Sequence, residues 1–148
     1  MMEQTEAIQA SLELVRNKPL VLAERFFDRL FREHPRFRSV FEGVDATDRE
    51  RVALSALTLT AEFSRAPGQM ERYLRRLAQR HIDYGARPDD LKPFVNTLLM
   101  TIAELSGETW THEAALAWRR AGERIGATMA EVVGQPSDTA RLARTRSD

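Results

Sequence analysis

The three histidines, His34, His81 and His112, are the side chains of this sequence best suited to ligate a metal ion or to exchange a proton near neutral pH. His34 precedes Pro35 at a predicted helix end, so we expect it to be solvated. His112 falls in the first turn of another predicted helix, where the helix dipole disfavours a cation, and we expect it to be neutral and exposed. His81 is therefore the candidate histidine for metal binding or proton exchange.

His81 lies on an apolar face of a predicted helix. Leu74, Leu77 and Ala78 precede it by seven, four and three residues, and these spacings share one side of a helix. A buried imidazole needs a partner for each ring nitrogen. Spacing alone favours a hydrogen-bonded core histidine over a metal ligand.

A single histidine suits haem better than it suits a bare metal ion. A bare ion usually requires three or four protein ligands, whereas a porphyrin supplies four nitrogens and needs one axial histidine inside an apolar pocket. Five of the seven phenylalanines lie between residues 26 and 41, which would crowd one corner of an ordinary core. A core histidine and a haem ligand both stay open at this point.

Composition excludes several classes of function. Cysteine is absent, which rules out disulfides, thiolate metal sites, iron–sulfur clusters and covalent thioether attachment of haem. The 22 basic and 22 acidic residues balance, so no overall field favours nucleic acid or anionic lipid. No phosphate-binding glycine loop, HExxH or GxSxG motif occurs. Neither a signal peptide nor an apolar run of membrane-spanning length is visible, which predicts a cytoplasmic protein with no membrane partner.

Helical periodicity recurs along the chain without strand-like alternation, and 148 residues suffice for one domain. We predict an all-α fold of about six long helices plus a short turn helix, followed by a polar tail over residues 135–148. Prolines, glycines and capping residues set the helix boundaries. The predicted starts are Thr5 for the first helix, Pro19 for the second, a capping box of Thr47 and Glu50 for the third, Pro88 for the fifth and Thr111 for the sixth. The predicted ends are Pro35 for the second helix, Pro67 for the third, Gly85 for the fourth, Gly107 for the fifth and Gly134 for the sixth.

Three segments resemble the bacterial haemoglobins. FFDRLFREHPRFRSVF (residues 26–41) resembles their second and third helices, and RHIDYGARPDDL (residues 80–91) resembles the segment around their haem-binding histidine. LLMTIAELSGETWTHEAALAW (residues 98–118) resembles the end of their penultimate helix and the start of their last. The similarity is to single-domain bacterial haemoglobins and to the globin domain of flavohaemoglobins. It implies a globin fold around a haem pocket, with residues 1–134 as the globin domain.

The resemblance implies non-covalent haem b, iron protoporphyrin IX, with His81 as the proximal ligand. One ring nitrogen of His81 would bind the iron, and the other would donate to a backbone carbonyl one turn earlier, which fixes the tautomer. The family's other roles carry over position by position. They give Phe41 a stacking role on the porphyrin, Arg80 and Tyr84 contacts with a haem propionate, and Leu98 and Leu99 positions in the pocket wall.

The distal side departs from the family. Phe27 stands where this group usually has tyrosine, and it has no hydroxyl to donate to a ligand. The family's spacing places Arg49 at the distal polar position and Ala53 one turn later over the iron, whereas a shift of one residue would place Asp48 and Val52 there. We expect Arg49 to turn toward solvent and pair with a propionate, with an inward orientation as the alternative.

The proximal side departs as well. Leu91 and Val133 stand where flavohaemoglobins have a tyrosine and a glutamate, which form a hydrogen-bonded relay with the proximal histidine. The relay raises the basicity of that histidine and promotes enzymatic chemistry on the haem. Without it, the resemblance implies gas binding more strongly than catalysis.

Three functions follow as alternatives. The first is a haem globin that reversibly binds oxygen, nitric oxide or carbon monoxide for transport, storage or sensing. The second is a nitric oxide dioxygenase-type haem enzyme that depends on an external reductase. The third is a haem-free globin-fold signalling module, against which His81 argues. A monomer and a homodimer are both compatible with the sequence, and no nucleic-acid partner is expected.

Overall fold

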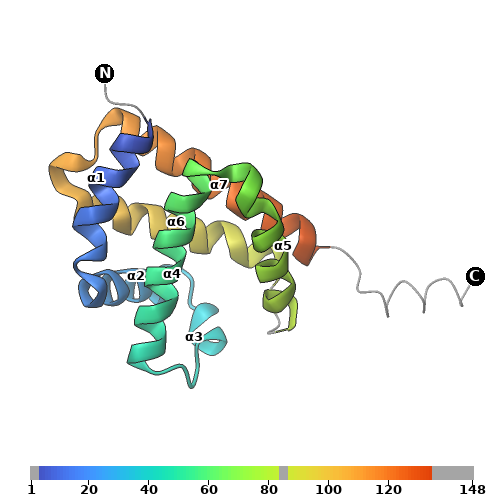
Figure 1. The fold of residues 1–148 in the computed structure, drawn as a ribbon. Helices are drawn as coiled ribbons and strands as arrows, with labels where there is room; N and C mark the ends of the chain where they lie inside the picture. Colours follow the sequence, from blue (N-terminus) through green and yellow to red (C-terminus); the bar gives the residue numbers. More distant parts are fainter. Residues whose placement is uncertain (1–3, 84–86, 135–148) are drawn as a thin grey trace, which may run out of the picture.

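The structure is a computed structural model that describes residues 4–83 and 87–134. Its described residues form seven α-helices and one short 3-10 helix, with no strand, arranged as Figure 1 shows. This confirms the predicted all-α architecture of six long helices and one short turn helix. The elements are α1 (Gln4–Arg16), α2 (Pro19–Glu33), α3 (Phe37–Val40), α4 (Ala46–Arg65), α5 (Pro67–Asp83), α6 (Pro88–Ser106), η1 (Gly107–Thr109) and α7 (His112–Val133).

Prolines and capping side chains set most of the helix starts. Pro19 and Pro88 occupy the first turns of α2 and α6, where the missing N–H costs no helical hydrogen bond. The Thr111 hydroxyl accepts a hydrogen bond from the backbone N–H of Ala114 at 3.1 Å and caps α7 as predicted. Gly134 follows the last residue of α7, also as predicted.

Two predicted helix starts are wrong. The capping residue of α4 is Asp45, whose carboxylate accepts from the Asp48 N–H at 2.8 Å, so the predicted box of Thr47 and Glu50 lies inside the helix. A carboxylate at this position meets both an unpaired N–H and the positive end of the helix dipole. Thr5 lies within α1 and does not precede it. The predicted end of α5 at Gly85 and the tail over residues 135–148 lie outside the described residues.

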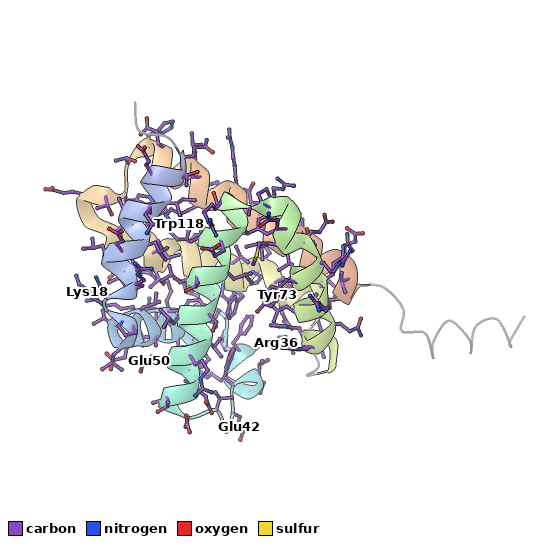
Figure 2. The ribbon with its side chains drawn as sticks, in the orientation of Figure 1. Lys18, Arg36, Glu42, Glu50, Tyr73 and Trp118 are labelled. Atoms are coloured by element: carbon purple, nitrogen blue, oxygen red, sulfur yellow. The ribbon has the colours of Figure 1, made fainter. Side chains whose placement is uncertain are left out.

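Helix α7 is the element around which the others pack. It contacts α1, α4, α5 and α6, while α2 packs against α4 and α6. Figure 1 shows α5 alongside the end of α7 that is remote from α1. Trp118 of α7, which is labelled in Figure 2, is fully buried between the helices.

The apolar interior consists of two clusters. The main core joins α1, α2, α4, α6 and α7, and it contains Trp118 and Phe26. The second cluster joins the end of α4, the middle of α5, the start of α6 and the end of α7, and we call it the α5–α7 cluster. Its buried members are Phe63, Leu74, Ala78, Leu91, Ile125, Met129, Val132 and Val133, with Leu59, Met70, Leu77 and Ala130 packed against them.

Gly122 allows α6 and α7 to approach closely. A Cβ atom at this position would lie 2.9 Å from Val95 Cγ1 and 3.1 Å from Leu99 Cδ1, nearer than carbon atoms normally approach. The glycine therefore helps to set the position of Leu99. Across the part of the chain that the structure describes, no helix has both the length and the apolarity needed to span a membrane.

Candidate functional site

The His81 side chain is fixed by one short hydrogen bond within α5. Its Nδ1 lies 2.8 Å from the backbone carbonyl oxygen of Leu77, one turn earlier, as expected. A carbonyl oxygen only accepts, so the proton of the neutral imidazole resides on Nδ1. Nε2 then keeps its lone pair and can serve as a metal ligand. The half-buried ring is therefore held in one tautomer by its own helix.

The surroundings of Leu77 are apolar. Leu77 packs against the α5–α7 cluster, which also includes the buried residues Leu91 and Val133. These two positions, which the resemblance places where flavohaemoglobins have a relay, thus belong to an apolar contact between α5, α6 and α7.

Across the fold from α5, aromatic rings of α2 meet the segment after α3. Phe27 is buried and its ring lies edge-on to Phe41, with the ring centroids 4.9 Å apart. Phe31 adds a third ring, 5.6 Å from Phe27 and 6.3 Å from Phe41. Phe31 and Phe41 are only half-buried, so the described protein leaves part of their apolar surface uncovered. We call Phe27, Phe31 and Phe41 the distal aromatic group.

Arg49 of α4 lies against the distal aromatic group and does not extend freely into solvent. Its guanidinium carbon is 5.1 Å from the centroid of Phe31 and 5.9 Å from that of Phe27. Nη2 donates to the backbone oxygen of Phe41 at 3.5 Å, and Nε is buried without a hydrogen-bond partner among the described residues. The Arg49 expected from the sequence to turn into solvent instead stacks its guanidinium on two rings, at the edge of a hollow that is open to solvent. The physical reason is that a guanidinium is weakly hydrated and stacks favourably on aromatic faces.

The alternative distal residue, Asp48, is placed differently. Its side chain is half exposed and pairs with Arg51 at 3.1 Å. Val52 is half-buried, and Ala53 is fully buried in the main core. Of the two distal assignments, only the one based on Arg49 brings a polar side chain next to Phe27.

The remaining predicted site residues divide by burial. Leu98 is almost fully buried in the main core, Leu99 is half-buried against it, and Arg80 is exposed on α5. Tyr84 lies outside the described residues. His112 is exposed as expected. His34 is not fully solvated, because it follows α2 directly and its half-buried ring meets Phe37 edge-on at 6.4 Å.

An ion pair that the sequence did not predict joins Arg36 to Asp90. The Arg36 Nε and Nη2 atoms each donate to one Asp90 oxygen at 2.7 Å, and the Arg87 backbone N–H donates to the same carboxylate at 3.0 Å. Asp90 is only 8% exposed. The pair ties the start of α3, in the region labelled by Arg36 in Figure 2, to the first turn of α6. Hydrogen bonds from Arg36 lower the pKa of Asp90, and the Arg87 N–H adds to this effect against the cost of burial.

Asp90→Asn is expected to reduce the free energy of unfolding by about 1–2 kcal/mol at pH 7, because it weakens two charge-assisted hydrogen bonds to a partly exposed arginine. The folded-state pKa of Asp90 is depressed below the unfolded value of about 3.9. The carboxylate therefore stabilises the fold above that value, and this stability is lost as the pH falls through the folded-state pKa.

Urea unfolding of the parent and Asp90→Asn between pH 7 and pH 3 measures this difference. Asp28→Asn is a suitable control, because it removes an exposed pair with Arg32 on α2. If the difference in free energy of unfolding between the parent and Asp90→Asn were as large at pH 3 as at pH 7, the stability could not be assigned to the charged pair.

The donor set fits haem and does not fit a bare metal ion. No described group of three or more histidine, cysteine or carboxylate side chains could hold an ion. His81 instead offers one imidazole nitrogen. The partly uncovered distal aromatic group and the apolar residues around Leu77 supply the kind of surface that a porphyrin needs.

Comparison with known proteins points to one family. The Globin family profile matches residues 24–129. The flavohemoprotein of Rhizobium meliloti (strain 1021) is 22% identical over 118 residues, covering 78% of this chain and 29% of that protein. The flavohemoproteins of Chromobacterium violaceum and Bordetella pertussis are 27% and 26% identical, covering 80% and 77% of this chain and 30% and 29% of theirs. The chain thus spans about three-tenths of the length of these curated relatives.

Proposed function

The chain belongs to the globin family, and from that premise we propose that it holds haem b non-covalently and reversibly binds a diatomic gas. The observation that carries the proposal is the hydrogen bond from His81 Nδ1 to Leu77, which leaves Nε2 free as a single axial ligand. The names of the flavohemoprotein relatives, which denote haem in those proteins, support the same cofactor.

When bound, haem supplies an iron atom with a coordination position for oxygen, nitric oxide or carbon monoxide. The residues of the chain hold and orient it. We assign His81 Nε2 as the iron ligand, Phe41 as a stacking ring, and Leu98 and Leu99 as walls that exclude water. Arg80 and Tyr84 are the proposed partners of a propionate.

The second candidate function is nitric oxide dioxygenation with a separate reductase, and the flavohemoprotein relatives favour it. The apolar α5–α7 cluster favours reversible binding, because Leu91 and Val133 offer no group that could accept or donate a hydrogen bond toward the proximal side. A cytoplasmic location, and a monomeric or homodimeric state, stay predictions from the sequence.

The absorption spectrum of the purified protein tests the proposal. We expect an intense Soret band, about one haem per chain, and reversible spectral changes when oxygen or carbon monoxide is added to the reduced protein. Protein that folds but takes up no haem would contradict the proposal and favour a signalling module. Steady consumption of nitric oxide with an added flavin reductase would favour the enzyme.

The proximal environment leads to a spectroscopic prediction. Because His81 donates to a neutral carbonyl and the α5–α7 cluster is apolar, the imidazole is expected to keep neutral character. The iron–histidine stretch of the reduced, gas-free protein, measured by resonance Raman spectroscopy, should match that of oxygen-carrier globins. A frequency in the peroxidase range would show that an acidic group bonds to His81.

A further inference from the structure

A hollow of about 540 Å³ opens to solvent beside the distal aromatic group. It is lined by Asp28, Phe31 and Arg32 of α2, by Arg38 of α3 and by Arg49 of α4. Three guanidinium groups therefore border it against one carboxylate. Phe31 and Arg49 also belong to the surface proposed to receive haem, whereas Asp28, Arg32 and Arg38 do not.

Pairing among these charges leaves two arginines in excess. Asp28 Oδ2 pairs with Arg32 Nη1 at 3.2 Å within α2. No carboxylate in the described part of the chain forms an ion pair with Arg38 or Arg49. The hollow thus presents the positive charge of Arg38 and Arg49 without a described counter-charge.

Arg49 also has unused hydrogen-bonding capacity. Its Nη2 makes one long hydrogen bond, to the Phe41 oxygen at 3.5 Å. A guanidinium matches the oxygens of an oxyanion with two parallel N–H bonds.

We propose that this hollow binds a small inorganic oxyanion between Arg38 and Arg49, and that this anion regulates gas release. The regulation of gas release rests on the proposed gas-binding function, whereas the binding of the anion does not. Arg49 connects the two sites, because its guanidinium lies against Phe27 and also lines the hollow. An anion that holds Arg49 toward Arg38 withdraws this guanidinium from Phe27 and from the gas.

The effect of the anion on oxygen release has a predicted direction and an upper limit. By linkage, an anion that draws Arg49 away speeds oxygen release, and oxygen weakens anion binding by the same factor. The effect cannot exceed that of removing the Arg49 guanidinium. Carbon monoxide, which acquires little negative charge, should be released at nearly the same rate with and without the anion.

Inorganic phosphate is the probe, added to the purified holoprotein at constant ionic strength maintained with sodium chloride. Calorimetry measures phosphate binding, and stopped-flow spectroscopy measures oxygen release. We expect saturable binding of one phosphate per chain and oxygen release that is about fivefold faster at saturation. Arg38→Met should abolish both effects, whereas Arg51→Met, an exposed arginine of α4 outside the hollow, should leave both unchanged.

Two outcomes would overturn the proposal. One is the absence of saturable phosphate binding, and the other is binding that survives Arg38→Met. A haem propionate shares this chemistry, so the titration is repeated with haem whose propionates are methyl esters. Phosphate that binds only the ester form would show that a propionate fills the hollow, which contradicts the free-anion site. Phosphate binding to protein that binds no gas would support the site while the proposed function fails.

Discussion

His81→Ala is expected to purify with little or no haem and to lose the Soret band. The substitution removes the imidazole that we propose as the iron ligand, whose Nδ1 is engaged with the Leu77 carbonyl so that Nε2 carries the lone pair. Haem would then be retained only by apolar contacts and by its propionates. Alanine is also an excellent helix former, so α5 itself should persist. Haem per chain, measured by pyridine haemochrome, and helicity, measured by far-ultraviolet circular dichroism, separate loss of the ligand from loss of the fold.

Imidazole added to His81→Ala should partly restore haem binding, because it replaces the missing ligand in the space left by the side chain. His112→Ala is the matched control, since His112 is exposed at the start of α7 and should leave haem content unchanged. His34→Ala provides a second control. Full haem content in His81→Ala, without added imidazole, would show that the proximal assignment is wrong.

Arg49→Leu is expected to speed oxygen release about tenfold or more while barely changing carbon monoxide release. The guanidinium of Arg49 lies against Phe27 and Phe31, and under the proposed function it donates to a gas that acquires negative charge. A charge-assisted hydrogen bond is worth roughly 1.5–3 kcal/mol, and each 1.4 kcal/mol is a factor of ten in rate when the association rate is unchanged. Stopped-flow displacement of oxygen by carbon monoxide measures the rate.

Phe27→Tyr should act in the opposite direction. A hydroxyl added to the ring of Phe27 supplies a neutral donor beside Arg49, and oxygen release should slow. Phe31→Tyr is a matched control, because Phe31 belongs to the same aromatic group but lines the outer hollow. Slow oxygen release that persists in Arg49→Leu would mean that another residue, such as Asp48, occupies the distal position.

Local patterns were sufficient to predict the helices. Proline at the start of α2 and α6, threonine before α7 and glycine after it act through bonds to residues at most four positions away. Such interactions are visible in the linear order of residues. The wrong start predicted for α4 also has a local cause. Asp45 and Thr47 lie two residues apart and each has a side-chain oxygen that can cap a helix, and the structure uses Asp45.

The sequence by itself determined the all-α fold, and its resemblance to the bacterial haemoglobins predicted the hydrogen bond of His81, whose ring and acceptor are four residues apart on one helix. Only the tertiary structure decided the orientation of Arg49 and the pairing of Arg36 with Asp90, 54 residues away. A flexible arginine reaches many positions with little difference in local energy. Which one it takes depends on rings and carboxylates that distant helices bring near, and helical periodicity carries no information about those contacts.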